Sequence, residues 1–203
     1  MIAIVNYGLG NLHSVHKAVM KVGGEALVTE NAADIRRADK VILPGVGAFA
    51  DGMQGLAERG LVEVVQEAAR SGKPLLGICL GMQLLFDESE EQGITRGLGL
   101  IPGEVRLFEN KTVKVPQIGW NQLQFEKASP LLVGLQPGDY VYFNHSYYCE
   151  PAEQADTLIS TEYGLRYASA VQRANVIGVQ FHPEKSQRVG LRILRNFVGW
   201  QHD

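Results

Sequence analysis

The chain has 203 residues, of which 45% are hydrophobic and 20% charged, and its formal net charge is -3 at pH 7. These values are close to those of average globular proteins, so they exclude a disordered chain and suggest no membrane-spanning helix. Because the chain has no basic excess and no cluster of Lys and Arg, we expect no nucleic-acid partner. The length fits one domain, and no linker or repeat divides the chain, so we expect a single domain over residues 1–203.

The first residues contain no positively charged segment, and the apolar run before Asn6 is shorter than the core of a secretory signal. We therefore expect a cytoplasmic protein. The chain has two cysteines, Cys79 and Cys149, which are too few for a disulfide framework. Each is therefore either a buried packing residue or a reactive thiol.

The first half of the chain alternates short apolar runs with helical patterns. The expected strands cover residues 2–5, 26–28, 41–43 and 75–78, and apolar residues repeat with helical spacing over 12–22 and 61–69. Alternation of this kind predicts a parallel sheet with helices on its faces.

After about residue 97 the pattern changes to short β-rich runs separated by Gly, Pro and Asn. The runs cover residues 104–108, 140–143, 157–161, 169–172 and 176–180, and a final helix is expected over 188–200. They predict antiparallel hairpins that extend the sheet. The expected fold is therefore a three-layer α/β/α, flavodoxin-like sheet, parallel in its N-terminal half and with antiparallel β hairpins in its C-terminal half.

Residues 75–86 read as an apolar strand, a Gly-x-Cys-x-Gly turn and an apolar helix, with Cys79 at the centre of the turn. This is the cysteine form of the nucleophile elbow, in which Gly77 and Gly81 avoid collisions with the neighbouring strand and helix. The start of the helix favours the thiolate form of the side chain. Cys79 is therefore the predicted nucleophile. Cys149 has no such turn, and we interpret it as a packing residue.

The strand over 176–180 is followed by His182, Pro183 and Glu184. Pro183 lacks an N–H and biases His182 toward an extended conformation, so the strand ends here. In an extended segment residues i and i+2 point the same way, which brings the Glu184 carboxylate toward the His182 ring. The alternative interpretation of His182 and Glu184 is an ordinary pair on the protein surface with no catalytic role. However, strand ends of this kind meet at the carboxyl edge of an α/β sheet, and together they predict a Cys79–His182–Glu184 triad.

His13 and His16 are spaced to share a helix face, but no third ligand lies near them in the sequence. We interpret them as solvent-exposed residues. No metal site and no cofactor are expected.

The sequence resembles the class I, triad-type glutamine amidotransferases over essentially its whole length. The segments that carry the resemblance are NYGLGN at 6–11, PGVGAF at 44–49, GICLGMQ at 77–83, PQIGWN at 116–121, HSY at 145–147 and GVQFHPEKS at 178–186. The resemblance implies that Cys79 attacks the side-chain amide of glutamine, releases ammonia and forms a glutamyl thioester that is then hydrolysed. It also implies a heterodimer with a (βα)8-barrel cyclase that consumes the ammonia.

The tetrahedral intermediate needs N–H donors for its oxyanion. The elbow offers the N–H of Leu80, and the second donor is expected from the glycine-rich loop near Val46 and Gly47. Reorientation of this loop is a switch that the resemblance implies, and a plain tight turn is the alternative.

The resemblance also implies which groups hold glutamine. Gly47, Gln83 and the backbone of His145, Ser146 and Tyr147 are expected to contact the substrate. Glu91 is a further candidate, with a solvent-exposed helix end as the alternative interpretation of the acidic run over 87–91.

The expected docking surface for the cyclase is the carboxyl edge of the sheet, with Asn11, Trp120, Tyr142 and Lys185. The aromatic faces of Trp120 and Tyr142 suit an interface or a gate for ammonia, and Lys185 offers a cation to a partner carboxylate. Core packing for the aromatic residues and a solvated charge for Lys185 are the alternatives.

Two other functions remain open. The chain could serve a different ammonia acceptor, as in the pyridoxal phosphate or anthranilate synthase type of glutaminase. It could also be a non-enzymatic, flavodoxin-like thiol sensor. His182 and Glu184 argue against a sensor, which needs a reactive thiol but no general base.

Overall fold

The computed structural model describes residues 1–109 and 113–201. The centre of its main sheet consists of parallel strands in the order β2-β1-β3-β4-β14. Their bounds are β1 Ile2–Val5, β2 Ala26–Thr29, β3 Lys40–Gly45, β4 Leu75–Cys79 and β14 Val176–Val179. Apart from the edge strand β2, these strands are almost fully buried, which explains their continuous apolar sequences.

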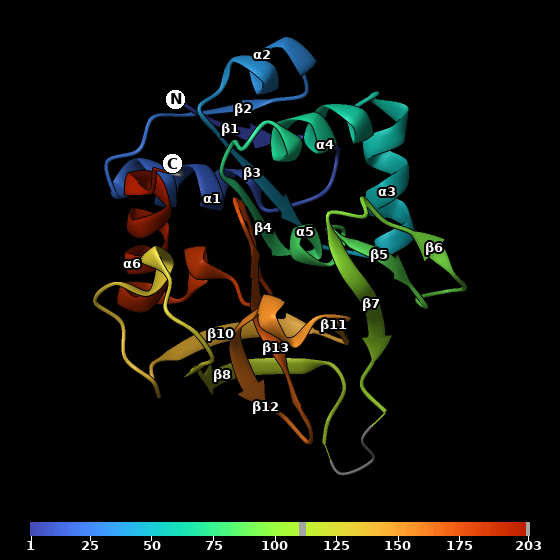
Figure 1. Ribbon diagram of the computed structural model, residues 1–203, viewed down its shortest axis with the longest axis vertical. Coiled ribbons are helices and arrows are strands. Elements are labelled where there is room, and N and C mark those ends of the chain that lie inside the picture. The colour runs from blue at the N-terminus through green and yellow to red at the C-terminus, as the bar shows by residue number, and fades with distance from the viewer. Residues whose placement is uncertain (110–112, 202–203) are drawn as a thin grey trace.

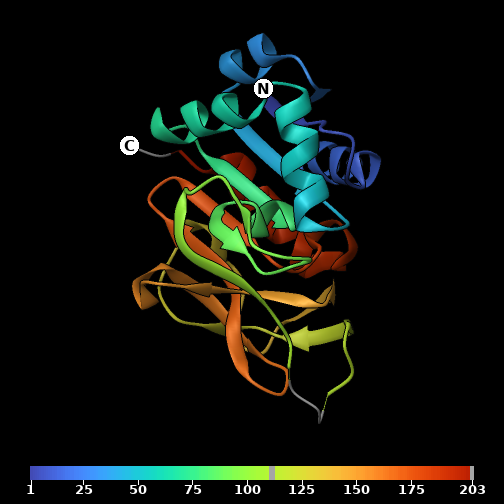
Figure 2. The same cartoon turned by 90° about the vertical axis from the view of Figure 1, so that its right-hand side faces the viewer.

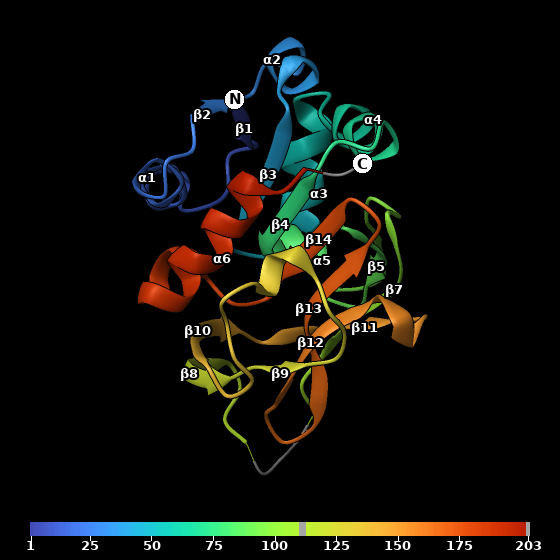
Figure 3. The same cartoon turned by 60° about the vertical axis from the view of Figure 1, so that its left-hand side comes forward.

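Helices cover both faces of these parallel strands (Figures 1 and 3). One face carries α1 Leu12–Lys21 and α6 Gln187–Gly199, which pack with Ile2 and Ile4 of β1. The other face carries α2 Ala32–Arg37, α3 Phe49–Glu58 and α4 Val62–Arg70, which pack with Ala3 and Val5. Alternate residues of one strand thus enter two different cores, and the expected three-layer arrangement is confirmed. Within residues 1–109 and 113–201, no helix has the length and apolar character needed to cross a bilayer.

Beyond β14 the sheet continues as β13-β11-β7-β5-β6 and becomes mostly antiparallel. This part extends past the helices (Figure 2). Its strands are β5 Phe86–Ser89, β6 Thr95–Arg96, β7 Ile101–Leu107, β9 Gln124–Phe125, β11 Tyr147–Pro151, β12 Thr157–Glu162 and β13 Arg166–Arg173, with short turns η1 Pro130–Leu132 and η2 Gln154–Asp156. The predicted change from parallel to antiparallel pairing is confirmed.

Two hairpin expectations are corrected. The run over 176–180 forms β14, which pairs antiparallel with β13 as expected but also pairs parallel with β4. The run over 140–143 does not extend the main sheet, because β10 Tyr140–His145 pairs with β8 Gln117–Gln122 in a separate two-stranded sheet. The acidic run over 87–91 is also not a helix end, since β5 occupies its first part. The elbow helix is shorter than expected, with α5 limited to Leu80–Gln83.

The topology places the carboxyl ends of β4 and β14 side by side. Ile78 pairs with Val179, and Gly77 pairs with Gly178, although about one hundred residues separate the two strands. A Cβ on Gly178 would lie 2.5 Å from the Met82 side chain, so glycine lets α5 pack against β14. The residues that follow both strands therefore share one edge of the sheet.

Candidate active site

Cys79 lies at the end of β4 with φ 54° and ψ −112°, a left-handed backbone conformation that is unusual for a residue with a side chain. The turn packs tightly against its neighbours. A Cβ on Gly81 would lie 1.7 Å from the Leu43 carbonyl oxygen, and one on Gly77 would lie 2.5 Å from the Gly81 carbonyl oxygen. The two glycines are therefore required for the elbow to sit on β3, and the Cys79 side chain is directed away from the sheet into a cavity.

His182 follows β14, and its side chain is buried, with 3% exposed. Its Nδ1 lies 2.9 Å from the Glu184 Oε1, and the Glu184 side chain is only 1% exposed. Burial by itself lowers the pKa of His182, but hydrogen bonds with Cys79 and Glu184 outweigh it and raise the pKa to about 9. The structure thus brings a thiol, an imidazole and a carboxylate into one hydrogen-bonded row.

The segment after His182 is not extended as the sequence predicts, because η3 Pro183–Lys185 forms a 3-10 turn. Ser186 links this turn to β10. Its hydroxyl donates to the His182 carbonyl oxygen at 2.7 Å and accepts the Tyr142 N–H at 2.9 Å. Sequence reasoning assigned Ser186 no role. In the sequence, the signal that could have pointed to Ser186 is a hydroxyl residue shortly after the histidine that follows a strand.

The cavity at this edge has a volume of about 290 Å³. Of the predicted residues it is lined by Cys79, His182, Val46, Gly47, Leu80, Gln83, Glu91, His145, Ser146, Tyr147 and Lys185. Glu184 lies behind His182, and Asn11, Trp120 and Tyr142 do not line the cavity. The predicted substrate and oxyanion residues are therefore brought together, and their roles remain proposals.

Two of these residues have contacts that the sequence did not predict. Glu91 accepts the Phe49 N–H at 2.8 Å through Oε2 and so caps the start of α3 while lining the cavity. The Tyr147 carbonyl oxygen accepts two hydrogen bonds, one from Gln83 Nε2 at 3.1 Å and one from His145 Nδ1 at 2.7 Å. That oxygen is already saturated and cannot also hold a substrate.

The loop expected to form the oxyanion hole follows β3, where Gly45 pairs with Cys79. Val46 is 40% exposed and Gly47 has φ 106°, which favours glycine. A Cβ on Gly45 would lie 2.2 Å from the Tyr7 hydroxyl, so this loop rests directly on Tyr7. The Tyr7 hydroxyl is buried and has no hydrogen-bond partner among the residues that the structure describes.

The proposed gate residues form a row beside His182. The Lys185 ammonium lies 5.8 Å from the centre of the Tyr142 ring, and the Trp120 ring meets that ring edge-on at 6.1 Å. Trp120 is 46% exposed, so it is not a core residue. Asn11 has a local contact instead, since its side chain accepts the Ser14 N–H and caps α1.

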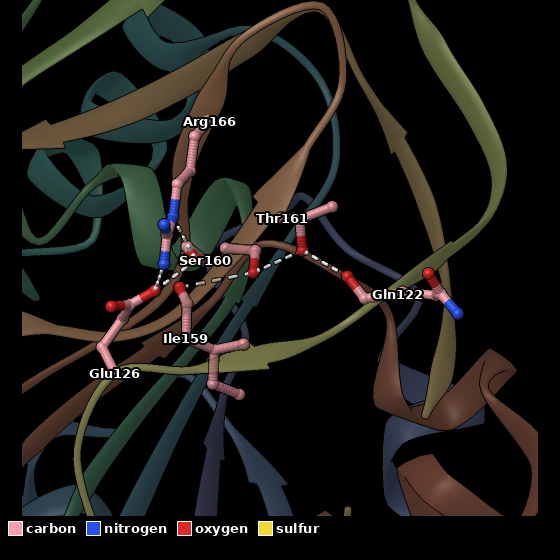
Figure 4. A network of polar contacts seen from close by, with 7 residues as sticks. Gln122, Glu126, Ile159, Ser160, Thr161 and Arg166 are labelled. Carbon is pink, nitrogen blue, oxygen red and sulfur yellow. Dashed lines mark hydrogen bonds and ion pairs between the residues drawn. The ribbon is translucent and has the colours of Figure 1, made fainter. Parts of the chain in front are cut away.

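A larger cavity of about 680 Å³ lies over β11, β12 and β13 and includes the buried Cys149. Two of its charged residues are paired with each other (Figure 4): Arg166 binds Glu126, and its Nε donates to the Ser160 hydroxyl at 2.9 Å. Glu150 binds Arg106 instead. Lys127 donates to two backbone carbonyl groups. Because these groups are already satisfied, the smaller cavity is the better candidate for chemistry despite its size.

No cluster of three or more His, Cys, Asp and Glu side chains suited to a metal ion occurs within residues 1–109 and 113–201. The cavity at Cys79 instead combines a thiol, an imidazole with a raised pKa and a nearby glycine-rich loop. This set of groups fits acyl transfer through a covalent intermediate.

Comparison with solved structures supports the fold. A crystal structure of a glutamine amidotransferase superposes with a TM-score of 0.77 at 20% identity, covering 98% of this chain and 100% of the other. The structure of PurLQS from Thermotoga maritima gives a TM-score of 0.75 at 19% identity, covering 97% of this chain and 96% of the other. At such identities the similarity concerns the fold alone.

Sequence comparison is more specific. A protein of Syntrophotalea carbinolica named imidazole glycerol phosphate synthase subunit HisH is 50% identical, covering 97% of this chain and 98% of its own. A protein of Moorella thermoacetica with the same name is 52% identical, covering 97% and 93%. The family model described as glutamine amidotransferase class-I matches residues 3–200. The chain belongs to the class-I glutamine amidotransferase family.

Proposed function

We propose that this chain is the glutaminase subunit of an imidazole glycerol phosphate synthase. It hydrolyses glutamine to glutamate and ammonia and delivers the ammonia to a (βα)8-barrel cyclase, which makes imidazole glycerol phosphate and AICAR in histidine biosynthesis. The observation that carries the proposal is the hydrogen-bonded row of Cys79, His182 and Glu184 at the cavity, in a chain about half identical to relatives of that name. The protein is proposed to be cytoplasmic, with one amidotransferase domain over residues 1–203.

In the proposed reaction, the Cys79 thiolate attacks the side-chain amide carbon of glutamine. The N–H groups of Leu80 and of the loop at Val46 and Gly47 bind the resulting oxyanion. The C–N bond then breaks as His182 gives its proton to the leaving nitrogen, so that ammonia departs and a thioester remains. Water attacks the thioester, His182 accepts a proton from that water, and cleavage of the C–S bond releases glutamate and restores the thiolate.

Glu184 orients the base in this scheme. Its Oε1 lies 2.9 Å from Nδ1 of His182, which leaves Nε2 for the thiol and the leaving group. The raised pKa of His182, about 9, means that the ring is protonated at neutral pH and ready to act as the acid for ammonia release.

Polar and charged residues of the cavity support glutamine as the proposed substrate. Gln83 and Glu91 both line the cavity, and their side-chain oxygens suit the α-ammonium group of glutamine. The backbone N–H groups of the segment from His145 to Tyr147, which lines the cavity, are proposed to bind the α-carboxylate, because a carboxylate only accepts hydrogen bonds.

The cyclase is proposed to dock on the face around Trp120. Ile118, Trp120 and Tyr140 are 58%, 46% and 52% exposed on the small β8–β10 sheet, next to the segment that carries His182. Large exposed apolar side chains of this kind are typical of a protein interface. Tyr142 and Lys185 lie between this face and the cavity, where they are proposed to gate ammonia.

The test is glutamate release from glutamine by the chain alone, with the cyclase, and with the cyclase plus its nucleotide substrate. We expect little turnover by the chain alone and a large increase with the loaded cyclase, because ammonia released without an acceptor is wasted. Maximal turnover by the isolated chain would contradict the coupling. No turnover in any of the three conditions would contradict the glutaminase assignment itself.

A further inference from the structure

Gln180 directly follows β14, and its side chain is completely buried behind the nucleophile. Its Nε2 lies 3.8 Å from the Cys79 Sγ, and its Oε1 lies 3.1 Å from the Nε2 of Gln83. Its backbone N–H donates to the Ser169 carbonyl oxygen at 2.9 Å, which holds the main chain against β13. The side chain therefore bridges the nucleophile and a residue of the cavity wall.

One backbone carbonyl group determines how both amides are oriented. The Tyr147 oxygen can only accept, so the Gln83 atom that lies 3.1 Å from it must be the amino group. The same amino group faces Gln180, which must therefore present its oxygen. The Gln180 amino group is then left to face the Cys79 sulfur.

His145 holds this carbonyl group in place. Its Nδ1 lies 2.7 Å from the Tyr147 oxygen and must carry a proton to bond with it. Burial, with a smaller contribution from the charge of His182, lowers the pKa of His145 to about 4. The ring is therefore neutral at pH 7, and the proton on Nδ1 is the one that the contact requires.

The hydrogen-bonded pair of Gln180 and Gln83 has different chemistry at its two ends. At one end an N–H group faces sulfur, and such a donor favours the thiolate over the thiol. At the other end the Gln83 oxygen bonds to no residue that the structure describes, and Gln83 lines the cavity. A carbonyl oxygen there is suited to the ammonium group of an amino acid.

We propose that Gln180 is a positioning residue for the reaction. One end of its amide holds the Cys79 thiolate, and the other end turns the Gln83 oxygen toward the α-ammonium group of glutamine. The orientation of the substrate and the ionisation of the nucleophile thus depend on the same buried side chain. This inference rests on the proposed glutaminase function.

The test uses Gln180→Met, which keeps the length of the side chain and removes both hydrogen bonds. Alkylation of Cys79 by iodoacetamide is measured against pH in the free chain, and KM for glutamine is measured in the complex with the cyclase. We expect the alkylation rate at pH 7 to fall about tenfold relative to its plateau at high pH, which equals a one-unit displacement of the pH profile. KM should rise by a similar factor.

Asn175→Ala is the matched control. Asn175 is a buried amide at the opposite end of β14, where it donates to the Ala69 and Lys73 carbonyl groups. Its loss should lower the melting temperature while leaving the alkylation profile and KM unchanged. If Gln180→Met does not fold, Gln180→Asn keeps a buried amide but withdraws it from the sulfur, and it should displace the profile in the same direction.

A folded Gln180 variant with the wild-type alkylation profile and the wild-type KM would overturn the inference. Alkylation requires no turnover, so this failure is distinguishable from failure of the proposed function, in which the wild-type complex would release no glutamate.

Discussion

The Tyr142 carbonyl oxygen accepts the backbone N–H of His182 at 2.9 Å, and the two side-chain rings lie 6.5 Å apart. The Tyr142 ring also meets the Trp120 ring edge-on and lies 5.8 Å from the Lys185 ammonium group. Only one aromatic ring therefore separates the exposed Trp120 from the proposed base. A partner that moves Trp120 or Lys185 acts on a residue bonded directly to His182.

Trp120→Ala is expected to weaken binding of the cyclase by roughly 30-fold or more, as is typical for a central aromatic residue of an interface. Calorimetry or surface plasmon resonance measures the Kd. Val133→Ala removes another exposed apolar side chain, 64% exposed and outside both β8 and β10, and it should leave the Kd unchanged. Equal Kd values for the two variants would place the interface elsewhere.

His182→Ala is expected to reduce kcat of the complex by about 10³-fold or more, and Glu184→Gln noticeably less. The difference follows from their contacts: His182 bonds to Cys79, whereas Glu184 bonds to the other nitrogen of the ring. Steady-state glutamate release compares the two variants. Equal losses would show that Glu184 has a role beyond orientation, for instance in holding the turn η3.

The pKa of His182 gives the stability of the fold a defined pH dependence. Since the pKa is about 9 in the folded chain and about 6.5 when unfolded, the folded state holds an extra proton between these values. The resulting stabilisation is complete below pH 6.5 and is lost as the pH rises through 9. Urea unfolding of the wild type and His182→Ala from pH 6 to pH 10 should show a difference in free energy that shrinks across this window. A constant difference would argue against the raised pKa.

A glutamine-like electrophile is expected to label Cys79 and leave Cys149 unmodified in the folded protein. Cys149 is 1% exposed, and burial raises the pKa of its thiol, so it lacks both access and thiolate character. Peptide mapping by mass spectrometry locates the label. Cys149→Ala should keep full labelling and Cys79→Ala should lose it, whereas label on Cys149 alone would contradict the choice of nucleophile.

Tyr7→Phe is expected to leave the chain as stable or to stabilise it by about 1 kcal/mol, because it removes a buried hydroxyl to which residues 1–109 and 113–201 offer no hydrogen-bond partner. Burial, and secondarily the charge of Cys79, raise the pKa of Tyr7 above its usual range, so the hydroxyl remains protonated at neutral pH. Thermal unfolding measures the effect. A loss of more than about 1 kcal/mol would show that the hydroxyl has a bonded partner in solution.

Local patterns were sufficient to predict the parallel strands β1 to β4, the turn at Cys79 and the end of a strand shortly before His182, but not the parallel pairing of β14 with β4. Each predicted feature depends on residues close in sequence, such as Gly77 and Gly81 around the nucleophile. Helix α3 was not predicted, because Gly52 and Gly55 interrupt its apolar pattern. In the structure Gly55 packs against the Tyr7 carbonyl oxygen, where a Cβ would lie 2.4 Å away, so a helix-weakening residue is required by tertiary packing.

Contacts between distant segments could not be predicted either, because they also depend on tertiary packing. The pairing of β8 with β10 depends on strand partners and not on the composition of either strand. Gln180 was visible as part of a motif, but its position between Cys79 and Gln83 follows from the pairing of β14 with β4. No periodicity within one strand carries that information.

The central place of β14 has a consequence for how the molecule is assembled. This strand comes after all the others along the chain, yet it lies between β4 and β13 in the middle of the sheet. The parallel strands that hold the nucleophile and the antiparallel strands beyond β13 therefore cannot join until it inserts. Such long-range pairing slows folding. It also means that Cys79 and the proposed base His182 are brought to the same edge only in the step that closes the sheet.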